Sequence, residues 1–161
     1  MPIQLLDTTI TGLGAGGLPA GTVTSSSLAA SGRLTCASAA RTSGQTLNGD
    51  SGWQDHLSVS FTCGVACRIL MILTTSIGYE SNTQGFFRFL VDGSKVGYNF
   101  QAGMQSDRNS AGAGSGSYWA DVSAGSHTVM VQARNVVGTW ITPYYSVDSG
   151  VANTLAVLYY A

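Results

Sequence analysis

The chain has 161 residues, of which 44% are hydrophobic and only 9% are charged, against roughly 25% in an average soluble domain. The net charge is −1 and the seven Lys and Arg residues are scattered, which excludes the basic patch of a nucleic-acid-binding surface and a polybasic membrane footprint. The 21 glycines and the many Ser and Thr residues favour strands, turns and surfaces covered by neighbouring subunits over exposed helices, which need Glu, Lys and Arg.

The N-terminus and the apolar runs argue against a leader or a membrane span. Residues 1–7 contain neither a basic region nor a long apolar stretch, so they do not match a secretory signal. The longest uncharged apolar run, residues 69–73, is too short to cross a bilayer. We therefore expect assembly in a cytoplasm, without membrane insertion.

Residues 1–51 carry single aliphatic side chains separated by Gly, Ser and Thr. Such a segment cannot alone bury enough surface to offset an ordering entropy of ~1–2 kcal/mol per residue. We therefore predict an extended N-terminal arm over residues 1–51 that docks on a partner surface; the alternative is disorder. A short helix over residues 25–32 is also compatible with the sequence, because Ser residues precede it and Gly32 would end it.

The cysteines do not form a metal or scaffold pattern. Cys36, Cys63 and Cys67 are odd in number, and the Cys63–Cys67 spacing of four differs from the CxxC of zinc and redox sites. We expect Cys63 and Cys67 to flank a tight turn, where they could form a disulfide after release from a reducing cell.

From Trp53 onward the chain has the pattern of strands. Residues 57–61 alternate between polar and apolar, and residues 68–77 are apolar enough to be covered on both faces, so the two predict a hairpin around the turn at 63–67. Asp92-Gly93 lies between residues 85–91 and 95–101, the strongest short-range signal for a second hairpin.

The last third of the chain combines a glycine-rich stretch with further strands. Residues 110–117 contain only Ser, Ala and Gly and predict a flexible loop. Further strands are expected at residues 118–122, 126–134 and 153–160. Seven or eight short strands without a helical period predict an all-β fold, an antiparallel β-sandwich of the jelly-roll type over residues 52–161.

Three stretches resemble bacteriophage surface proteins. Residues 118–134, with the core Val-Ser-Ala-Gly-Ser-His-Thr-Val-Met-Val-Gln-Ala from Val122, are similar to the penultimate strand pair of jelly-roll domains in tail fibres and capsid decoration proteins. Residues 153–160 resemble the strand that closes such domains, and residues 17–28 resemble their N-terminal linkers. These domains are similar in architecture to the trimeric tumour-necrosis-factor and C1q heads. The resemblance implies a homotrimer around a threefold axis, attached to a virion.

No catalytic or cofactor pattern is visible, so we expect a non-enzymatic protein without cofactor, metal or nucleic acid. No carboxylate or nucleophile is tied by spacing to His127, which we expect to hydrogen-bond backbone in the core or at a turn. We expect His56 to begin a strand or to meet a neighbouring subunit. The glycine-rich residues 12–17 lack the flanking strand and helix of a dinucleotide site.

Aromatic side chains are the remaining candidates for a contact surface. Trp119 follows Tyr118, while Trp140, Tyr144 and Tyr145 fall in an expected loop over residues 140–145, placed at an end of the sandwich because Pro143 cannot donate to a central ladder. They either pack the sandwich or the subunit interface, or they form a rim that binds sugar or host.

Two functional classes remain open. The first is a homotrimeric capsid decoration (cement) protein that binds the major capsid protein through residues 1–51 and stabilises the outer head surface. The second is the receptor-binding head of a short tail fibre or head fibre, recognising a host-surface glycan. We expect decoration, because fibres carry a long shaft before the head and this chain shows none.

Overall fold

The computed structural model describes residues 5–6, 9–10, 34–48, 52–79, 83–105, 110–137, 139–142 and 152–160. Its strands are β1 (Leu5–Leu6), β2 (Thr9–Ile10), β3 (Leu34–Arg41), β4 (Gln45–Asn48), β5 (Gln54–Cys63), β6 (Cys67–Tyr79), β7 (Thr83–Val91), β8 (Ser94–Gln105), β9 (Ser110–Val122), β10 (Gly125–Val137), β11 (Thr139–Thr142) and β12 (Asn153–Tyr160). Within these ranges there is no helix of the length and apolarity that crossing a membrane requires.

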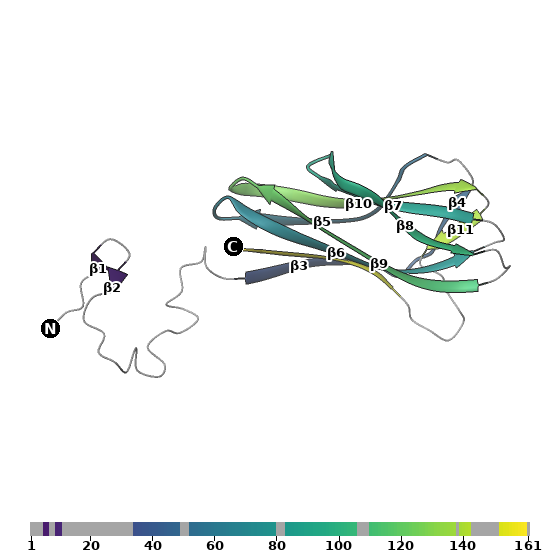
Figure 1. Cartoon of the computed structure of the whole chain (residues 1–161), viewed down its shortest axis with the longest axis horizontal. Coiled ribbons are helices and arrows are strands. Elements are labelled where there is room, and N and C mark those ends of the chain that lie inside the picture. Colours follow the sequence, from purple (N-terminus) through teal and green to yellow (C-terminus); the bar gives the residue numbers. More distant parts are fainter. Residues whose placement is uncertain are drawn as a thin grey trace, which may run out of the picture.

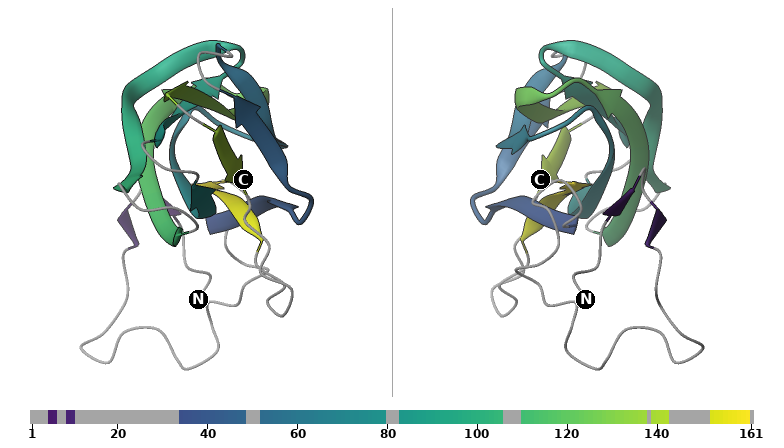
Figure 2. Two further views of the ribbon diagram at one scale, coloured as in Figure 1. Left: turned by 90° about the vertical axis from the view of Figure 1, so that its right-hand side faces the viewer. Right: turned by 90° about the vertical axis from the view of Figure 1, so that its left-hand side faces the viewer.

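Two antiparallel sheets form the body of the structure (Figures 1 and 2). One has the order β5-β10-β7-β8; the other has the order β3-β12-β6-β11-β4, with β9 along the opposite edge of β6. The long strands thus make two four-stranded layers, β3-β12-β6-β9 and β5-β10-β7-β8. The chain crosses repeatedly from one layer to the other, as in a jelly roll. The predicted all-β sandwich is confirmed.

The core lies between the layers because each strand buries every second side chain. The pattern is regular in β10 and β12, where buried and part-exposed residues alternate. The largest side chains with almost no exposure come from both sheets: Phe87, Phe89, Leu47, Ile69, Met71, Leu73, Ile77 and Leu155.

The sandwich begins earlier than the predicted boundary near residue 52. β3 pairs with β12 over its whole length, from Arg41↔Asn153 to Leu34↔Tyr160, and Leu47 of β4 is completely buried. The segment is poor in large apolar residues because the apolar side chains that β3 turns inward, Ala37 and Ala39, are small and pack against the core. The docking role of the arm remains a prediction, and the helix considered over residues 25–32 lies outside the described residues.

The predicted hairpin of β5 and β6 is wrong, because the two strands lie in different sheets and residues 64–66 cross between them. Alternation shows which face of a strand is apolar but not which strand is its neighbour. The second predicted hairpin is confirmed: Asp92 and Gly93 have φ of 50° and 79°, and β7 pairs with β8.

Two segments predicted as loops are strands. Residues 110–117 belong to β9, which pairs with β6 from Tyr79↔Ser110 to Cys67↔Val122. Residues 140–142 belong to β11, which pairs with β4 and β6. Pro143, Tyr144 and Tyr145 lie outside the described residues.

Aromatic rings explain why β9 tolerates so much glycine. A Cβ on Gly116 would come within 2.5 Å of the Phe100 ring of β8, and one on Gly97 of β8 would come within 2.6 Å of the Tyr118 ring of β9. Each edge strand thus offers a glycine to an aromatic ring of the other. Gly97 also has φ of +67°, which disfavours any side chain there. These two contacts close the sandwich between β8 and β9.

We expect Gly116→Ala to destabilise the fold by about 1–3 kcal/mol, because the new methyl group would overlap the Phe100 ring. Chemical denaturation measures the change. Gly114→Ala in the same strand is the control, since its nearest neighbour would be the Thr75 hydroxyl at 3.2 Å. If Gly116→Ala instead stabilised the fold, as replacing an ordinary glycine inside a strand by alanine does, the proposed contact would be contradicted.

Candidate functional site

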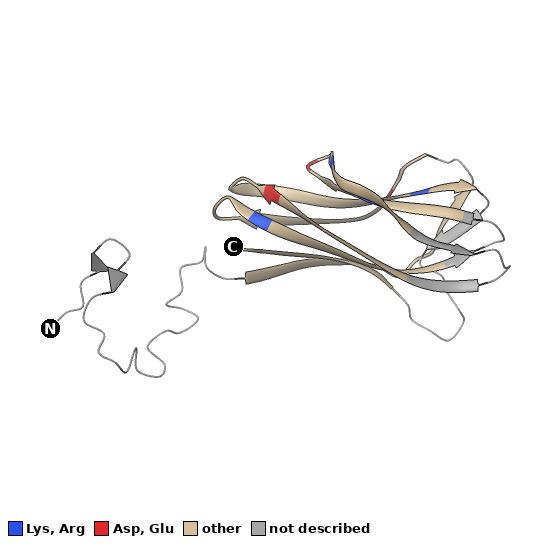
Figure 3. Cartoon of the chain, in the orientation of Figure 1, with Lys and Arg blue, Asp and Glu red and all other residues tan. Residues whose placement is uncertain are grey.

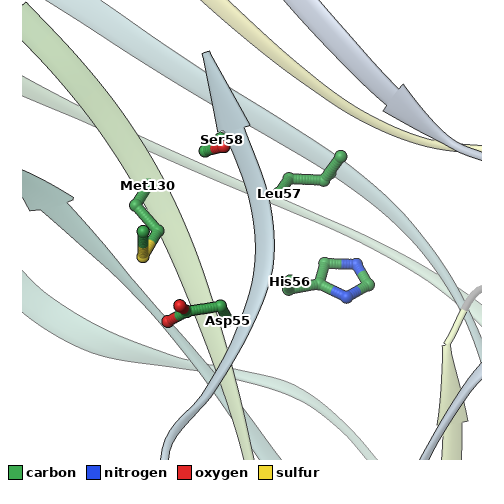
Figure 4. Close-up of a pocket in the computed structure, with 5 residues that line it drawn as sticks. All are labelled: Asp55, His56, Leu57, Ser58 and Met130. Atoms are coloured by element: carbon green, nitrogen blue, oxygen red, sulfur yellow. The ribbon is translucent and has the colours of Figure 1, made fainter. Parts of the chain in front are cut away.

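A β-bulge in β5 turns His56 into the interior. The β5–β10 register runs from Val131↔Leu57 to Gln132↔Asp55, so His56 is the extra residue. A depression of about 150 Å³ at the bulge is lined by Asp55, His56, Leu57, Ser58 and Met130. Figure 4 shows His56 and Leu57 on one side of the strand and the other three on the opposite side.

His56 is the centre of a buried polar network. Its Nδ1 lies 2.8 Å from Gln45 Oε1, and its Nε2 lies 2.8 Å from Asn153 Nδ2. Asn153 also accepts a hydrogen bond of 2.6 Å from the Ser76 backbone N–H. Since Asn153 donates to Nε2, the imidazole is neutral with its proton on Nδ1. Burial, with a smaller contribution from the Arg41 charge, lowers the pKa of His56 to about 4.

His127 connects two turns at the other end of β10. Its Nδ1 lies 2.7 Å from Asp92 Oδ2 and its Nε2 lies 3.0 Å from the Ser123 carbonyl. Both partners accept hydrogen bonds, so the protonated ring satisfies both, and the bond to Asp92 raises the pKa of His127. The predicted backbone bond is confirmed, whereas the carboxylate partner 35 residues away had no signal in the sequence.

Both histidines therefore have partners within the chain. Of the two alternatives for His56, the position at the start of a strand is confirmed, because β5 begins at Gln54 and the His56 side chain is buried inside the chain. Within the described ranges no three His, Cys, Asp or Glu side chains are grouped so that they could hold a metal ion.

Several exposed large apolar side chains lie on the outer face of β3-β12-β6-β9, here called the apolar face. Directly opposed residues of antiparallel strands share a face, so the pairings give its rows. One row is Cys36, Leu158, Leu70 and Trp119, and the next is Ser38, Ala156, Ile72 and Ser117. Beyond the first row lies the pair Leu34 and Tyr160. Trp119 is 50% exposed, Leu70 38% and Leu34 64%.

The charged pair at one end of the apolar face is internally neutralised. Arg68 Nε donates to Asp121 Oδ1 at 2.8 Å, and Arg68 Nη2 donates to Oδ2 at 3.1 Å. The guanidinium lies 4.0 Å from the ring centroid of Trp119, a cation–π geometry. The hydrogen bonds from Arg68 lower the pKa of Asp121. The pair holds Trp119 in place and adds no net charge.

The outer face of the four-stranded sheet is polar instead. Hydroxyl pairs link β5 to β10, with Ser60 Oγ 3.1 Å from Thr128 Oγ1. Arg88 donates to Gln132, whose amide donates to Asp55 at 2.7 Å. Charges are nevertheless few over the strands as a whole (Figure 3). The two outer faces therefore differ: one suits solvent, and the other suits a partner.

A second candidate is an aromatic cleft between β8 and β9. The cleft has a volume of about 150 Å³ and is lined by Phe89, Tyr98, Phe100, Gly116, Ser117 and Tyr118. The β7–β8 register shifts between Phe87↔Phe100 and Phe89↔Val96, so β8 bulges around Tyr98, which is 85% exposed. Bulges often re-aim a side chain at a binding site.

Of the predicted aromatic residues, the structure describes the side chains of Tyr118 and Trp119, whose ring centroids lie 6.1 Å apart in a stacked arrangement. Trp119 lies on the apolar face, Tyr118 packs inward on Gly97, and the backbone of Trp140 lies in β11. The side chain of Trp140, and Tyr144 and Tyr145, lie outside the described residues. Tyr98 was not among the predicted contact residues; a glycine directly before an aromatic residue in a strand is the signal that could have indicated it.

Comparison with known proteins gives a likeness of fold only. No protein-family model matches the chain, and no curated protein matches it. The structure of infectious bursal disease virus Gx strain matches with a TM-score of 0.40 and 9% identity, over 81% of this chain and 37% of that one. The structure of infectious bursal disease virus Gt strain matches with a TM-score of 0.38 and 10% identity, over 80% of this chain and 37% of that one. Likenesses this weak assign no function.

We expect the free energy of unfolding to fall as the pH is lowered from 6.5 to about 4. In this window the unfolded chain protonates His56 and the folded chain does not, so stability falls by up to about 1.4 kcal/mol per pH unit. The contribution of neutral His56 to the free energy of unfolding is complete above pH 6.5 and lost below about pH 4. Urea titrations at several pH values measure it.

His56→Gln should flatten this dependence between pH 4 and 6.5. His127→Gln should leave this pH dependence intact. Because the pKa of His127 is raised in the folded chain, its contribution to stability is complete below the pKa of the unfolded chain and is lost only as the pH rises above it. An unchanged slope in His56→Gln would show that another group titrates.

Proposed function

We propose that this chain is a non-enzymatic structural protein of a bacteriophage particle. In this proposal it is a homotrimeric capsid decoration protein that stabilises the outer head surface, with copies in contact through the apolar face. The observation that carries the proposal is the row of apolar side chains across β3, β12, β6 and β9. The outer face of the other sheet is polar.

The exposed apolar side chains support a permanent contact. Leu70, Trp119 and Leu34 stand on strands that are rigidly paired, so covering them costs little conformational entropy. Obligate interfaces resemble a protein core cut in half, and aromatic residues are enriched at their centres. Trp119, held by Arg68, has the position of such an anchor.

The charges on the apolar face favour further copies of the same chain as the partners that cover it. A distinct charged partner would be selected by complementary charges, but Arg68 and Asp121 already neutralise one another. Around a threefold axis, each copy can therefore turn this face toward its neighbours without repulsion between like charges. The trimeric state and the virion location follow from the resemblance of residues 118–134 and 153–160 to phage jelly-roll domains.

The N-terminal arm supplies the attachment in this proposal. Residues 11–33 precede β3, whose first residue, Leu34, stands at the margin of the apolar face. In this proposal the residues before β3 bind the major capsid protein beside the contact region, while the polar four-stranded sheet faces solvent.

We expect Leu70→Lys to convert the oligomer to a folded monomer, because the lysine would be buried unpaired at the contact. The dissociation constant should rise by about 30-fold or more. Light scattering coupled to size-exclusion chromatography gives the mass, and circular dichroism checks the fold. Alkylation of exposed Cys36 in the same row should be slow in the oligomer and fast in the variant.

Ser58→Lys is the matched control, since Ser58 is exposed on the other sheet. It should keep the oligomer. A wild-type monomer at micromolar concentration, or an unchanged mass for Leu70→Lys, would reject the proposed interface.

Glycan recognition by a fibre head is the second candidate, favoured by the aromatic cleft. Aromatic rings and hydroxyls without a charged residue suit the apolar face of a neutral pyranose. Tyr98→Ala should then weaken binding to arrayed neutral hexose oligosaccharides by about 10-fold or more. Tyr160→Ala, on the apolar face, should leave binding unchanged. If no neutral glycan binds the wild type, this candidate fails.

A further inference from the structure

Cys63 and Cys67 lie where the chain passes from one sheet to the other. Cys63 ends β5 and pairs with Gly125 of β10, and Cys67 begins β6 and pairs with Val122 of β9. The β5–β6 and β9–β10 connections therefore meet at the same end of the sandwich. A covalent bond between the two cysteines would join the four-stranded sheet to the six-stranded sheet at this point.

The two thiols are already in contact. Their Sγ atoms lie 3.0 Å apart, about 1 Å more than the length of a disulfide bond. Cys63 is 1% exposed and belongs to the core, whereas Cys67 is partly exposed. The neighbouring connection of Gly64, Val65 and Ala66 is exposed and lets a small reagent reach Cys67.

We propose that Cys63 and Cys67 are a modification site, at which a low-molecular-weight disulfide such as glutathione disulfide forms an intramolecular disulfide that fastens the two sheets together. This goes beyond the structural function proposed above and does not depend on it.

The reaction proceeds by two exchanges. The Cys67 thiolate attacks one sulfur of glutathione disulfide, which forms a mixed disulfide and releases one glutathione thiolate. Cys63 then gives up its proton, and its thiolate attacks the Cys67 sulfur of the mixed disulfide and expels the second glutathione as a thiolate, which takes up a proton. Two protein thiols are oxidised to one disulfide, and one glutathione disulfide is reduced to two thiols.

The environments of the cysteines assign their order of reaction. Burial, together with the hydrogen bond to Cys67, raises the pKa of Cys63 to about 12, so Cys63 stays a thiol at neutral pH. The thiolate is the attacking species, which leaves the first attack to the more exposed Cys67. Cys63 is held against Cys67 and acts in the second exchange.

The test equilibrates the full chain with glutathione buffers of increasing disulfide content, stops the exchange with acid, alkylates all remaining thiols under denaturing conditions and measures the intact mass. We expect the alkylated thiols to fall from three to one, with the remaining label on Cys36 and the peptide map showing Cys63 joined to Cys67. The melting temperature should rise by about 4–8 °C and return on reduction.

Cys36→Ser should lose one label and otherwise behave as the wild type, whereas Cys67→Ser should show no shift in melting temperature. Three labels after equilibration, a stable mixed disulfide at Cys67, or oxidation only through Cys36 between chains would each overturn the proposal. The mass measurement uses the wild-type chain, so it decides even if a variant fails to fold.

Discussion

Strand β6 is the element on which the rest of the structure depends. It pairs along its whole length with β9, and on its other side with β12 and then β11. Its inward side chains Ile69, Met71 and Leu73 are completely buried, while Leu70 and Ile72 point to the opposite face. Apolar side chains on both faces are typical of strands that are covered on both sides, and in this chain the facing sheet covers one of them.

The edge strands β8 and β9 are held together by close contacts between glycines and aromatic rings rather than by additional large apolar side chains. Phe100 lies on Gly116 and Tyr118 lies on Gly97, so the edges of the two sheets approach each other where a side chain would separate them. At the opposite side, the neutral ring of His56 joins β4, β5 and β12 through Gln45 and Asn153. A buried polar network specifies one arrangement of these strands only while every member has a partner, which makes its protonation state a condition of the fold.

The distribution of polarity links this architecture to assembly. Hydroxyl pairs and the Arg88–Gln132–Asp55 network pair polar side chains on the outer face of the four-stranded sheet. The six-stranded face has its charges combined in Arg68 and Asp121 and leaves Trp119 and Leu70 exposed. The two outer faces of one sheet pair therefore differ in polarity, and the proposed contact between copies uses the less polar one. The Cys63–Cys67 end joins these two layers and is the natural place for a covalent link between them.

Local sequence information determined the elements that depend on adjacent residues. The alternation in β10 and β12 and the turn at Asp92-Gly93 follow from side-chain direction and from tolerance of positive φ, and the structure has them where they were predicted. Only the tertiary structure decided the partners. Glycine-rich β9 looked like a loop because its stabilising rings come from another strand, and β3 looked like an arm because β12, more than a hundred residues later, covers its edge. His56 was ambiguous for the same reason: a bulge and the distant Asn153 fix its direction, and neither leaves a signal near it in the chain.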